Sequence, residues 1–208
     1  MVALYGRLPR RPTPSRISPE SIAAGLFALY SLEHRRYHNM MHVEECLEEL
    51  DWSLYQCTDP IACEMAVWYH DVVYEPTSDQ NERLSANKAL FDCLRLGVTD
   101  EVFKDAVVRL ILGTKHSSEA KGDAATVADI DLSILGKPWE RFSEYERQIR
   151  EEYSHVPDRD FAAGRTAILD GFLRRPSIYW TTHFRERYEK PARANIALSI
   201  RKLGAAHA

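Results

Sequence analysis

The chain has 208 residues, of which 45% are hydrophobic and 28% charged, so it can bury one substantial core and its length favours a single domain. A net charge of −4 excludes a global positive field for a nucleic-acid polymer, and no stretch approaches the roughly 20 apolar residues of a membrane span. We therefore expect a cytoplasmic protein that acts on a small anionic substrate, without a membrane or nucleic-acid partner.

The N-terminal segment differs in composition from the rest of the chain. Residues 1–17 contain three prolines and four arginines but no acid, which predicts a loose arm before a helical domain over 18–208. Ser18 followed by Pro19 is typical of a helix start, and we expect this helix to run to about residue 33. Its apolar positions recur at helical spacing: Ile22, Leu26, Leu29 and Leu32.

Two helices then carry the residues of most interest. An amphipathic pattern runs from Met41 to about Tyr55 and predicts one buried face. Asp59 followed by Pro60 restarts a helix, which we expect to continue to Val73. This second helix is apolar nearly all round, so it should lie at the centre of the fold.

The remaining chain also favours helices. The expected elements are a helix over about 80–96 that stops at Gly97, one capped by Thr99 that runs to about Gly113, an apolar segment over 127–135, and helical stretches over about 139–154, 158–174 and 184–203. No alternating pattern bounded by hairpin signals appears, so strands have little support. The sequence therefore predicts an all-α protein with one compact helical domain.

Four cysteines are spread over the first half of the chain. Cys46, Cys57, Cys63 and Cys93 form no CxxC pair, and a chain of this size does not need disulfides to fold. We expect reduced and mostly buried thiols.

The dipeptide His70-Asp71 lies on the most apolar predicted helix. A buried charged pair there would cost several kcal/mol without a partner or a metal, and imidazole beside carboxylate is a ligand set for a divalent cation. The alternative is structural, an aspartate that only orients a core histidine.

Two histidines precede this pair at helical spacing. His38 and His42 are four residues apart, so on one helix they would stand one above the other and could reach one centre. His42 could instead be an ordinary histidine at a helix start. His34 has the same spacing but is expected to lie before the helix.

The apolar segment VADIDLSILG contains two aspartates that are candidate metal ligands. Asp129 and Asp131 would both be costly there unless paired, so at least one should be a ligand. Only two positions apart, they point in different directions on a helix. Asp131 is the preferred ligand, and Asp129 could cap a helix or bond to a ligating histidine.

These residues resemble the HD superfamily of metal-dependent phosphohydrolases, whose ligand order is a lone His, then His-Asp, then a distant Asp. The resemblance implies that His42, His70, Asp71 and Asp131 hold the metal. The motif YHN followed by His42 also resembles that of cyclic-nucleotide phosphodiesterases, which implies that His38 is a proton donor.

Over most of residues 25–200, the chain is also similar to a group of small bacterial predicted HD phosphohydrolases. The similarity rests on the segments YHN, WYHDVVY, NERLSA, TKH, DIDLSILG, IREEY and GR.

Other polar residues are candidates for the substrate or a second metal. Glu82, beside Asn81 and Ser85, follows the loop after His70-Asp71, and Lys115 with His116 follows an apolar helix. Arg165 could bind phosphate in bidentate geometry, although a surface ion pair is the alternative for each basic residue. The same two alternatives, phosphate binding and a surface ion pair, apply to Arg83, Lys88 and Arg150.

The predicted activity is hydrolysis of a nucleotide or another small phosphate ester, as a phosphomonoesterase or phosphodiesterase. The cofactor would be one or two divalent ions of Mn, Fe, Co, Ni, Zn or Mg. In this scheme Asp71 accepts a proton from water and His38 protonates the leaving oxygen. Two alternatives stay open: a di-iron oxygenase that recruits His116 and Glu82, and a non-enzymatic nucleotide-sensing or structural module.

Overall fold

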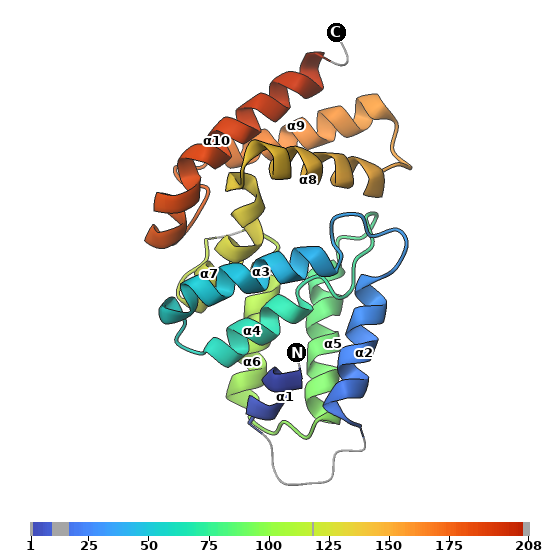
Figure 1. The fold of residues 1–208 in the computed structure, drawn as a ribbon, viewed down its shortest axis with the longest axis vertical. Coiled ribbons are helices and arrows are strands. Elements are labelled where there is room, and N and C mark those ends of the chain that lie inside the picture. The colour runs from blue at the N-terminus through green and yellow to red at the C-terminus, as the bar shows by residue number, and fades with distance from the viewer. Residues whose placement is uncertain (1, 10–16, 118, 206–208) are drawn as a thin grey trace. The chain divides into compact units, whose positions relative to one another are not determined.

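The computed structural model describes residues 2–9, 17–117 and 119–205. Within these ranges the chain forms α-helices and short 3₁₀ turns and no strand, which confirms the all-α prediction (Figure 1). No helix in the described ranges is long and apolar enough to cross a membrane. The chain divides into two compact units, Met1–Ala128 and Asp129–Ala208. A single domain over 18–208 stays a prediction.

The helices follow the chain in a simple order. The first unit holds α1 (Val2–Arg7), α2 (Pro19–Tyr30), α3 (Met40–Ser53), the 3₁₀ turn η1 (Leu54–Gln56), α4 (Pro60–Tyr69), α5 (Asn81–Arg95) and α6 (Glu101–Gly113). Helix α7 (Asp123–Asp131) begins in the first unit and ends in the second. The second unit continues with the 3₁₀ turn η2 (Leu132–Gly136), α8 (Trp139–Glu152), α9 (Asp158–Arg174) and α10 (Thr182–Ala205).

Side-chain caps start several helices where the sequence indicates them. The Ser18 hydroxyl accepts a hydrogen bond from the Ser21 N–H, and Asp59 caps α4 in the same way. The cap of α6 is Asp100, whose carboxylate accepts from the Phe103 N–H at 3.1 Å, so the prediction of Thr99 is wrong by one residue. A carboxylate at this position also interacts favourably with the helix dipole.

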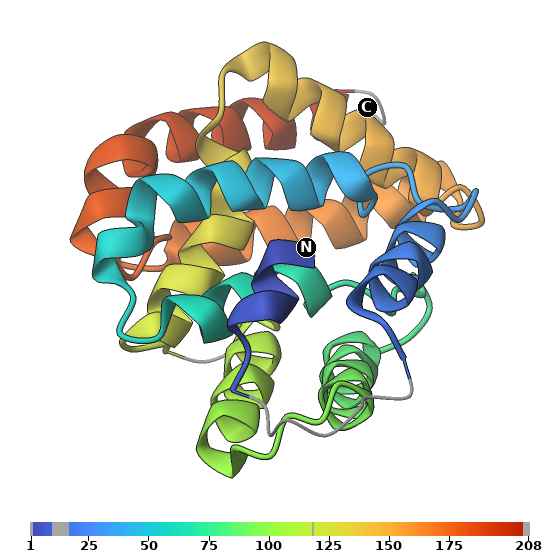
Figure 2. The ribbon, with the colours of Figure 1, turned by 60° about the horizontal axis from the view of Figure 1, so that its bottom comes forward.

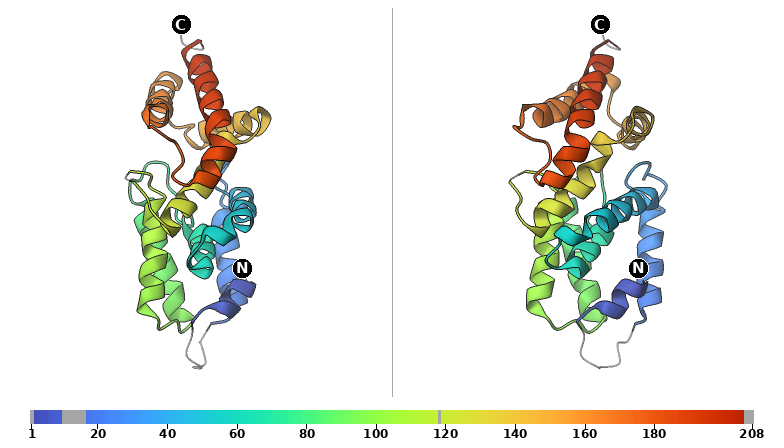
Figure 3. Two further views of the ribbon diagram at one scale, coloured as in Figure 1. Left: turned by 90° about the vertical axis from the view of Figure 1, so that its left-hand side faces the viewer. Right: turned by 60° about the vertical axis from the view of Figure 1, so that its left-hand side comes forward.

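Helix α4 is the centre of the first unit. It packs against α1, α3, α5 and α6, and every residue from Met65 to Tyr69 is buried. Figure 2 shows α1 against α4, and Figure 3 shows α5 and α6 side by side. The nearly uniform apolar surface of α4 requires neighbours on all sides, as its sequence indicates.

The N-terminal residues include an ordered helix instead of a wholly loose arm. In α1, Leu4 and Tyr5 are fully buried, and the Tyr5 hydroxyl lies 3.0 Å from that of Tyr69. The Tyr69 hydroxyl donates in turn to the Asp92 carboxylate at 2.9 Å. Two apolar side chains and this buried hydrogen-bond chain therefore hold α1 on α4, although positions 10–16 of the predicted arm lie outside the described residues.

In the second unit, η2 packs against α10, and α9 and α8 also contact α10. The Asn195 amide on α10 donates to the carbonyls of Leu135 and Lys137 at 2.9 and 2.8 Å. These two bonds satisfy carbonyls at the end of η2 that lack a helical partner. The core combines aliphatic side chains with the aromatic rings of Phe142, Tyr179 and Phe184.

Candidate metal centre

The first ligand candidate, His42, lies in the first turn of α3. The Asn39 side chain caps this helix by accepting from the Met41 N–H at 2.8 Å, and His42 is 2% exposed. His38 precedes the cap, so the prediction that His38 and His42 share one helix face is wrong. The two rings nevertheless lie 6.0 Å apart in an edge arrangement, because the turn before α3 folds back towards the helix.

His70 comes directly after the last residue of α4. The expected helix to Val73 is too long, since α4 ends at Tyr69 and His70 is its C-cap. The Nδ1 atom of His70 lies 2.9 Å from the Val67 carbonyl oxygen, which can only accept a hydrogen bond. Nδ1 therefore carries a hydrogen, and Nε2 is the ring atom that faces the other polar groups of the centre.

A buried arginine supports the turn after His70. The Arg35 guanidinium donates to the carbonyls of His38, Asp71 and Val72 at 2.9, 2.7 and 2.9 Å. It also lies over the rings of Tyr30 and Tyr74, at 5.1 and 5.7 Å from their centroids. Arg35 thus ties the loop that carries His38 to the turn that carries Asp71.

Donor atoms converge between α3 and the end of α4. The Nε2 atoms of His42 and His70 are 3.0 Å apart, and Asp71 Oδ2 lies 3.0 Å from the His70 Nε2 and 3.5 Å from the His42 Nε2. Cys46, one turn after His42, is buried and offers a donor atom within 4.8 Å of those of both histidines. The buried donors of His42, Cys46 and His70, with the Asp71 carboxylate against the two imidazoles, are consistent with a metal site.

Two divalent-metal ligands bound at about 2.0–2.1 Å are separated by about 2.8–3.4 Å, for bond angles between 90° and the tetrahedral value. The two 3.0 Å separations among the three N and O atoms lie within this range, and the 3.5 Å separation lies just above it. The donor chemistry therefore fits a divalent cation.

The pKa of the Asp71 carboxyl is also consistent with a cation-binding site. Burial raises the pKa of its carboxyl, but the charge of His70 and hydrogen bonds from His42 and His70 outweigh burial and hold the pKa well below its ordinary value. Asp71 is therefore an anion at neutral pH, which is the form that binds cations.

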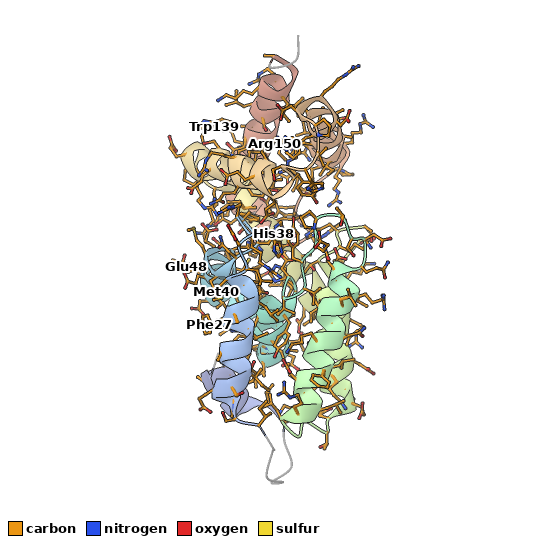
Figure 4. All side chains as sticks on the ribbon, turned by 90° about the vertical axis from the view of Figure 1, so that its right-hand side faces the viewer. Phe27, His38, Met40, Glu48, Trp139 and Arg150 are labelled. Atoms are coloured by element: carbon orange, nitrogen blue, oxygen red, sulfur yellow. The ribbon has the colours of Figure 1, made fainter. Side chains whose placement is uncertain are left out.

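His38 lies beside this cluster. Its ring stacks on Tyr74, with centroids 3.9 Å apart and an interplanar angle of 23°. It is half-buried, and Figure 4 labels it near the start of α3, where Met40 and Glu48 mark the helix. A partly exposed imidazole held by stacking is suited to exchange a proton with a bound molecule.

The two aspartates of α7 have different surroundings. Asp129 is fully buried, and its carboxylate oxygens accept from the backbone N–H groups of Trp180 and Thr181 at 2.8 and 2.7 Å. These residues directly precede α10, so Asp129 serves a capping role close to the alternative drawn from the sequence. Asp131 is the last residue of α7 and belongs to the second unit.

The loop after Asp71 is fixed by residues at the start of α5. The Asn81 amide accepts from the Glu75 N–H through Oδ1 and donates to the Glu75 carbonyl through Nδ2. The Ser85 hydroxyl accepts from the Val73 N–H and donates to the Val73 carbonyl. Asn81 and Ser85 therefore hold the loop that leaves the candidate centre.

Glu82 and Lys115 are brought together on the first unit. Lys115 Nζ lies 3.9 Å from the Glu82 carboxylate and donates to the Asp79 carbonyl at 2.7 Å. His116 follows with a φ of 54°, a left-handed conformation that is uncommon outside glycine. The three residues form a polar group near the C-terminal end of α6.

Arg165 lies in the second unit and is committed to internal partners. Its guanidinium pairs with Glu146 and donates to the Tyr145 hydroxyl at 2.7 Å, and its side chain is 9% exposed. The other basic candidates also have partners: Arg83 bonds Gln80, Lys88 pairs with Asp92, and Arg150 pairs with Asp158. The ion-pair alternative fits Lys88, Arg150 and Arg165.

Sequence reasoning missed two residues of the centre. Cys46 is four positions after His42, the same spacing that drew attention to His38, and this spacing could have identified it. Arg35 gave no comparable signal, because its partners are backbone carbonyls far along the chain.

Comparisons with protein-family models, with curated proteins and with solved structures gave no match.

Proposed function

We propose that this protein is a metal-dependent phosphohydrolase that acts on a nucleotide or another small phosphate ester. The observation that carries the proposal is the convergence of His42 Nε2, His70 Nε2 and Asp71 Oδ2 within 3.5 Å of one another. Two buried imidazoles whose Nε2 atoms approach to 3.0 Å beside a carboxylate are costly unless a cation or a shared proton lies between them.

We propose His42, His70 and Asp71 as ligands of a divalent cation, joined by Asp131. The first residue of α7, Asp123, accepts from the backbone N–H groups of Thr58 and Asp59, both at 2.8 Å. These bonds tie the start of α7 to the start of α4, the helix that leads to His70. The two oxygens of Asp129 already accept backbone hydrogen bonds, which favours Asp131 over Asp129.

A divalent cation at this centre supplies Lewis-acid polarisation of a phosphoryl oxygen and lowers the pKa of coordinated water. The residues of the chain orient the reaction around it. Asp71, anionic at neutral pH, accepts a hydrogen bond from the attacking water and aligns it. His38, whose imidazole is stacked on Tyr74, donates a proton to the leaving oxygen.

Substrate contacts are proposed from the polar group of the first unit. Lys115 is about half exposed, and its ammonium can exchange its contact with Glu82 for a phosphate oxygen. His116 beside it can add a second hydrogen bond. Arg165 is less suited to this role because Glu146 and Tyr145 occupy its donors.

The test combines metal analysis of the purified protein with a screen of nucleotides and general phosphoesters in the presence of Mn²⁺, Co²⁺, Ni²⁺, Zn²⁺ or Mg²⁺. Asp71→Ala should lose both bound metal and metal-dependent phosphate release, because it removes an anionic ligand. Asp51→Ala, which removes an exposed aspartate of α3, is the matched control and should retain both. A wild-type protein that binds none of these ions, and whose turnover none of them stimulates, would contradict the proposal.

A further inference from the structure

Cys46 differs from the other cysteines of the chain in what surrounds it. Its sulfur lies 3.7 Å from His42 Nδ1 and 3.8 Å from His42 Nε2, and the side chain is 2% exposed. By contrast, the Cys93 thiol contacts the Met65 sulfur at 3.9 Å, and Cys57 and Cys63 interact with each other. Cys46 is therefore the cysteine that the described fold places among nitrogen donors.

Helix geometry fixes this arrangement. His42 and Cys46 are one turn apart on α3, so their side chains leave the helix on the same face. This face is turned towards His70, because the two histidine Nε2 atoms approach to 3.0 Å. The sulfur and both imidazoles offer donor atoms that all lie within 4.8 Å of one another. Three donors thus come from two elements of one unit.

We infer that the Cys46 sulfur is a direct ligand in the metal centre, an inference that rests on the proposed function. The HD pattern described above contains histidine and aspartate ligands but no cysteine, so this ligand is particular to the chain. With Cys46 bound as a thiolate, the donors His42, Cys46 and His70 hold two nitrogens and one anion, and Asp71 beside the two imidazoles adds a second negative charge. These two negative charges balance a divalent cation.

The donor separations agree with this assignment. A metal–sulfur bond of about 2.3 Å and a metal–nitrogen bond of about 2.0–2.1 Å put the two donors about 3.5 Å apart at a tetrahedral angle. The sulfur of Cys46 and Nε2 of His42 lie 3.8 Å apart. Because the sulfur is as far from Nδ1 as from Nε2, binding of one ion by the sulfur and Nε2 requires rotation of the Cys46 or His42 side chain.

A thiolate ligand determines which metals the centre selects. Sulfur is a soft donor that suits Zn²⁺, Co²⁺ and Fe²⁺, whereas Mg²⁺ requires oxygen donors and retains its waters. We therefore narrow the metal from the broad set of the sequence analysis to these softer ions.

The test is a titration of the metal-free full-length protein with Co²⁺, followed both by equilibrium dialysis and by absorption. Thiolate coordination produces a sulfur-to-cobalt charge-transfer band in the near ultraviolet, which nitrogen and oxygen ligands do not give. We expect this band in the wild type, its loss in Cys46→Ser, and its retention in Cys57→Ser as the matched control. Cys46→Ser should also narrow the preference for Zn²⁺ over Mg²⁺ by about tenfold or more.

X-ray absorption of the zinc-loaded wild type gives a second readout that needs no variant, and so does not depend on whether Cys46→Ser folds. A sulfur shell at about 2.3 Å is expected. Cobalt binding without the band, or zinc binding without the sulfur shell, overturns the role of Cys46 and leaves the proposed hydrolase intact. Absence of any metal binding in dialysis instead contradicts the proposed function itself.

Discussion

The guanidinium of Arg35 donates a 2.7 Å hydrogen bond to the backbone carbonyl of Asp71, 36 positions along the chain. The same side chain binds the carbonyl of His38, so one buried cation sets the spacing between two loops of the candidate centre. Neither loop is helical at these positions. Arg35 is therefore a positioning residue for the centre.

Replacing Arg35 by lysine should weaken the centre, because one ammonium cannot reproduce the planar fork that reaches three carbonyls. We expect Arg35→Lys to lower metal affinity about tenfold to a hundredfold and the free energy of unfolding by about 1–3 kcal/mol. Calorimetric zinc titration and urea unfolding measure the two effects. Arg36→Lys, at the exposed neighbouring position, should change neither, and wild-type metal affinity in Arg35→Lys would refute the positioning role.

His38→Asn should separate catalysis from metal binding. The asparagine cannot act as a general acid near neutral pH, so kcat should fall about a hundredfold to ten-thousandfold while bound metal stays at the wild-type level. His34→Asn, at an exposed histidine bonded to the Tyr74 carbonyl, should keep wild-type turnover. Unchanged turnover in His38→Asn would favour a structural module.

Substitution of each of the two aspartates of α7 should have a different effect on the protein. Asp129→Asn places an amide N–H₂ against backbone donors at Trp180 and Thr181, so we expect a loss of about 1–3 kcal/mol of stability with metal content unchanged. Asp131→Asn should lose metal with a much smaller change in the stability of the metal-free protein. Urea unfolding and metal analysis of both variants decide the matter, and the reverse pattern would assign the ligand role to Asp129.

Glu189 should make stability depend on pH in the acid range. Burial raises its pKa, but hydrogen bonds from the Ile178 N–H, the Ser177 hydroxyl and Arg193 outweigh burial and lower it below the ordinary value of 4.5. A lowered folded-state pKa means that the stabilisation is fully present above 4.5 and is lost as the pH falls through the folded value.

Glu189→Gln should therefore cost about 1 kcal/mol at neutral pH, a figure that allows for solvent at a side chain 21% exposed. The difference in the free energy of unfolding between wild type and variant should shrink as the pH is lowered below 4.5. Urea unfolding across this range measures it. A difference that stays constant or grows on acidification would contradict the assignment.

Gly136 lies where η2 meets α10, and a side chain there has no room. An added Cβ would lie 2.6 Å from the Cβ of Tyr188 and 3.0 Å from its Cα, so Gly136→Ala should destabilise by about 1–3 kcal/mol or more. Gly171→Ala on α9 is the control, since nothing lies within 4 Å of its added Cβ. That substitution should stabilise by about 0.4–1 kcal/mol, as measured by thermal unfolding. Equal stability of the two variants would argue against this packing.

The sequence by itself determined the helices and the main ligand candidates. Serine or aspartate followed by proline started α2 and α4 where predicted, because capping is a local interaction between neighbouring residues. The predicted range over 158–174 was confirmed as α9. The His70-Asp71 pair was identified because polar side chains on an apolar helix require a partner, and His42 because of its spacing from His38 and the resemblance to the HD superfamily.

Only the tertiary structure decided how the loops meet. The end of α4 at Tyr69 depends on Arg35 and Ser85, which bond the following backbone from distant positions, and no local pattern encodes such bonds. From the sequence, Cys46 was expected to be an ordinary buried thiol. The fold places it beside the imidazoles. Asp129 took a capping role because backbone N–H groups 51 and 52 positions away reach its carboxylate. Long-range hydrogen bonds fix these features, and residue order alone does not reveal which distant groups will meet.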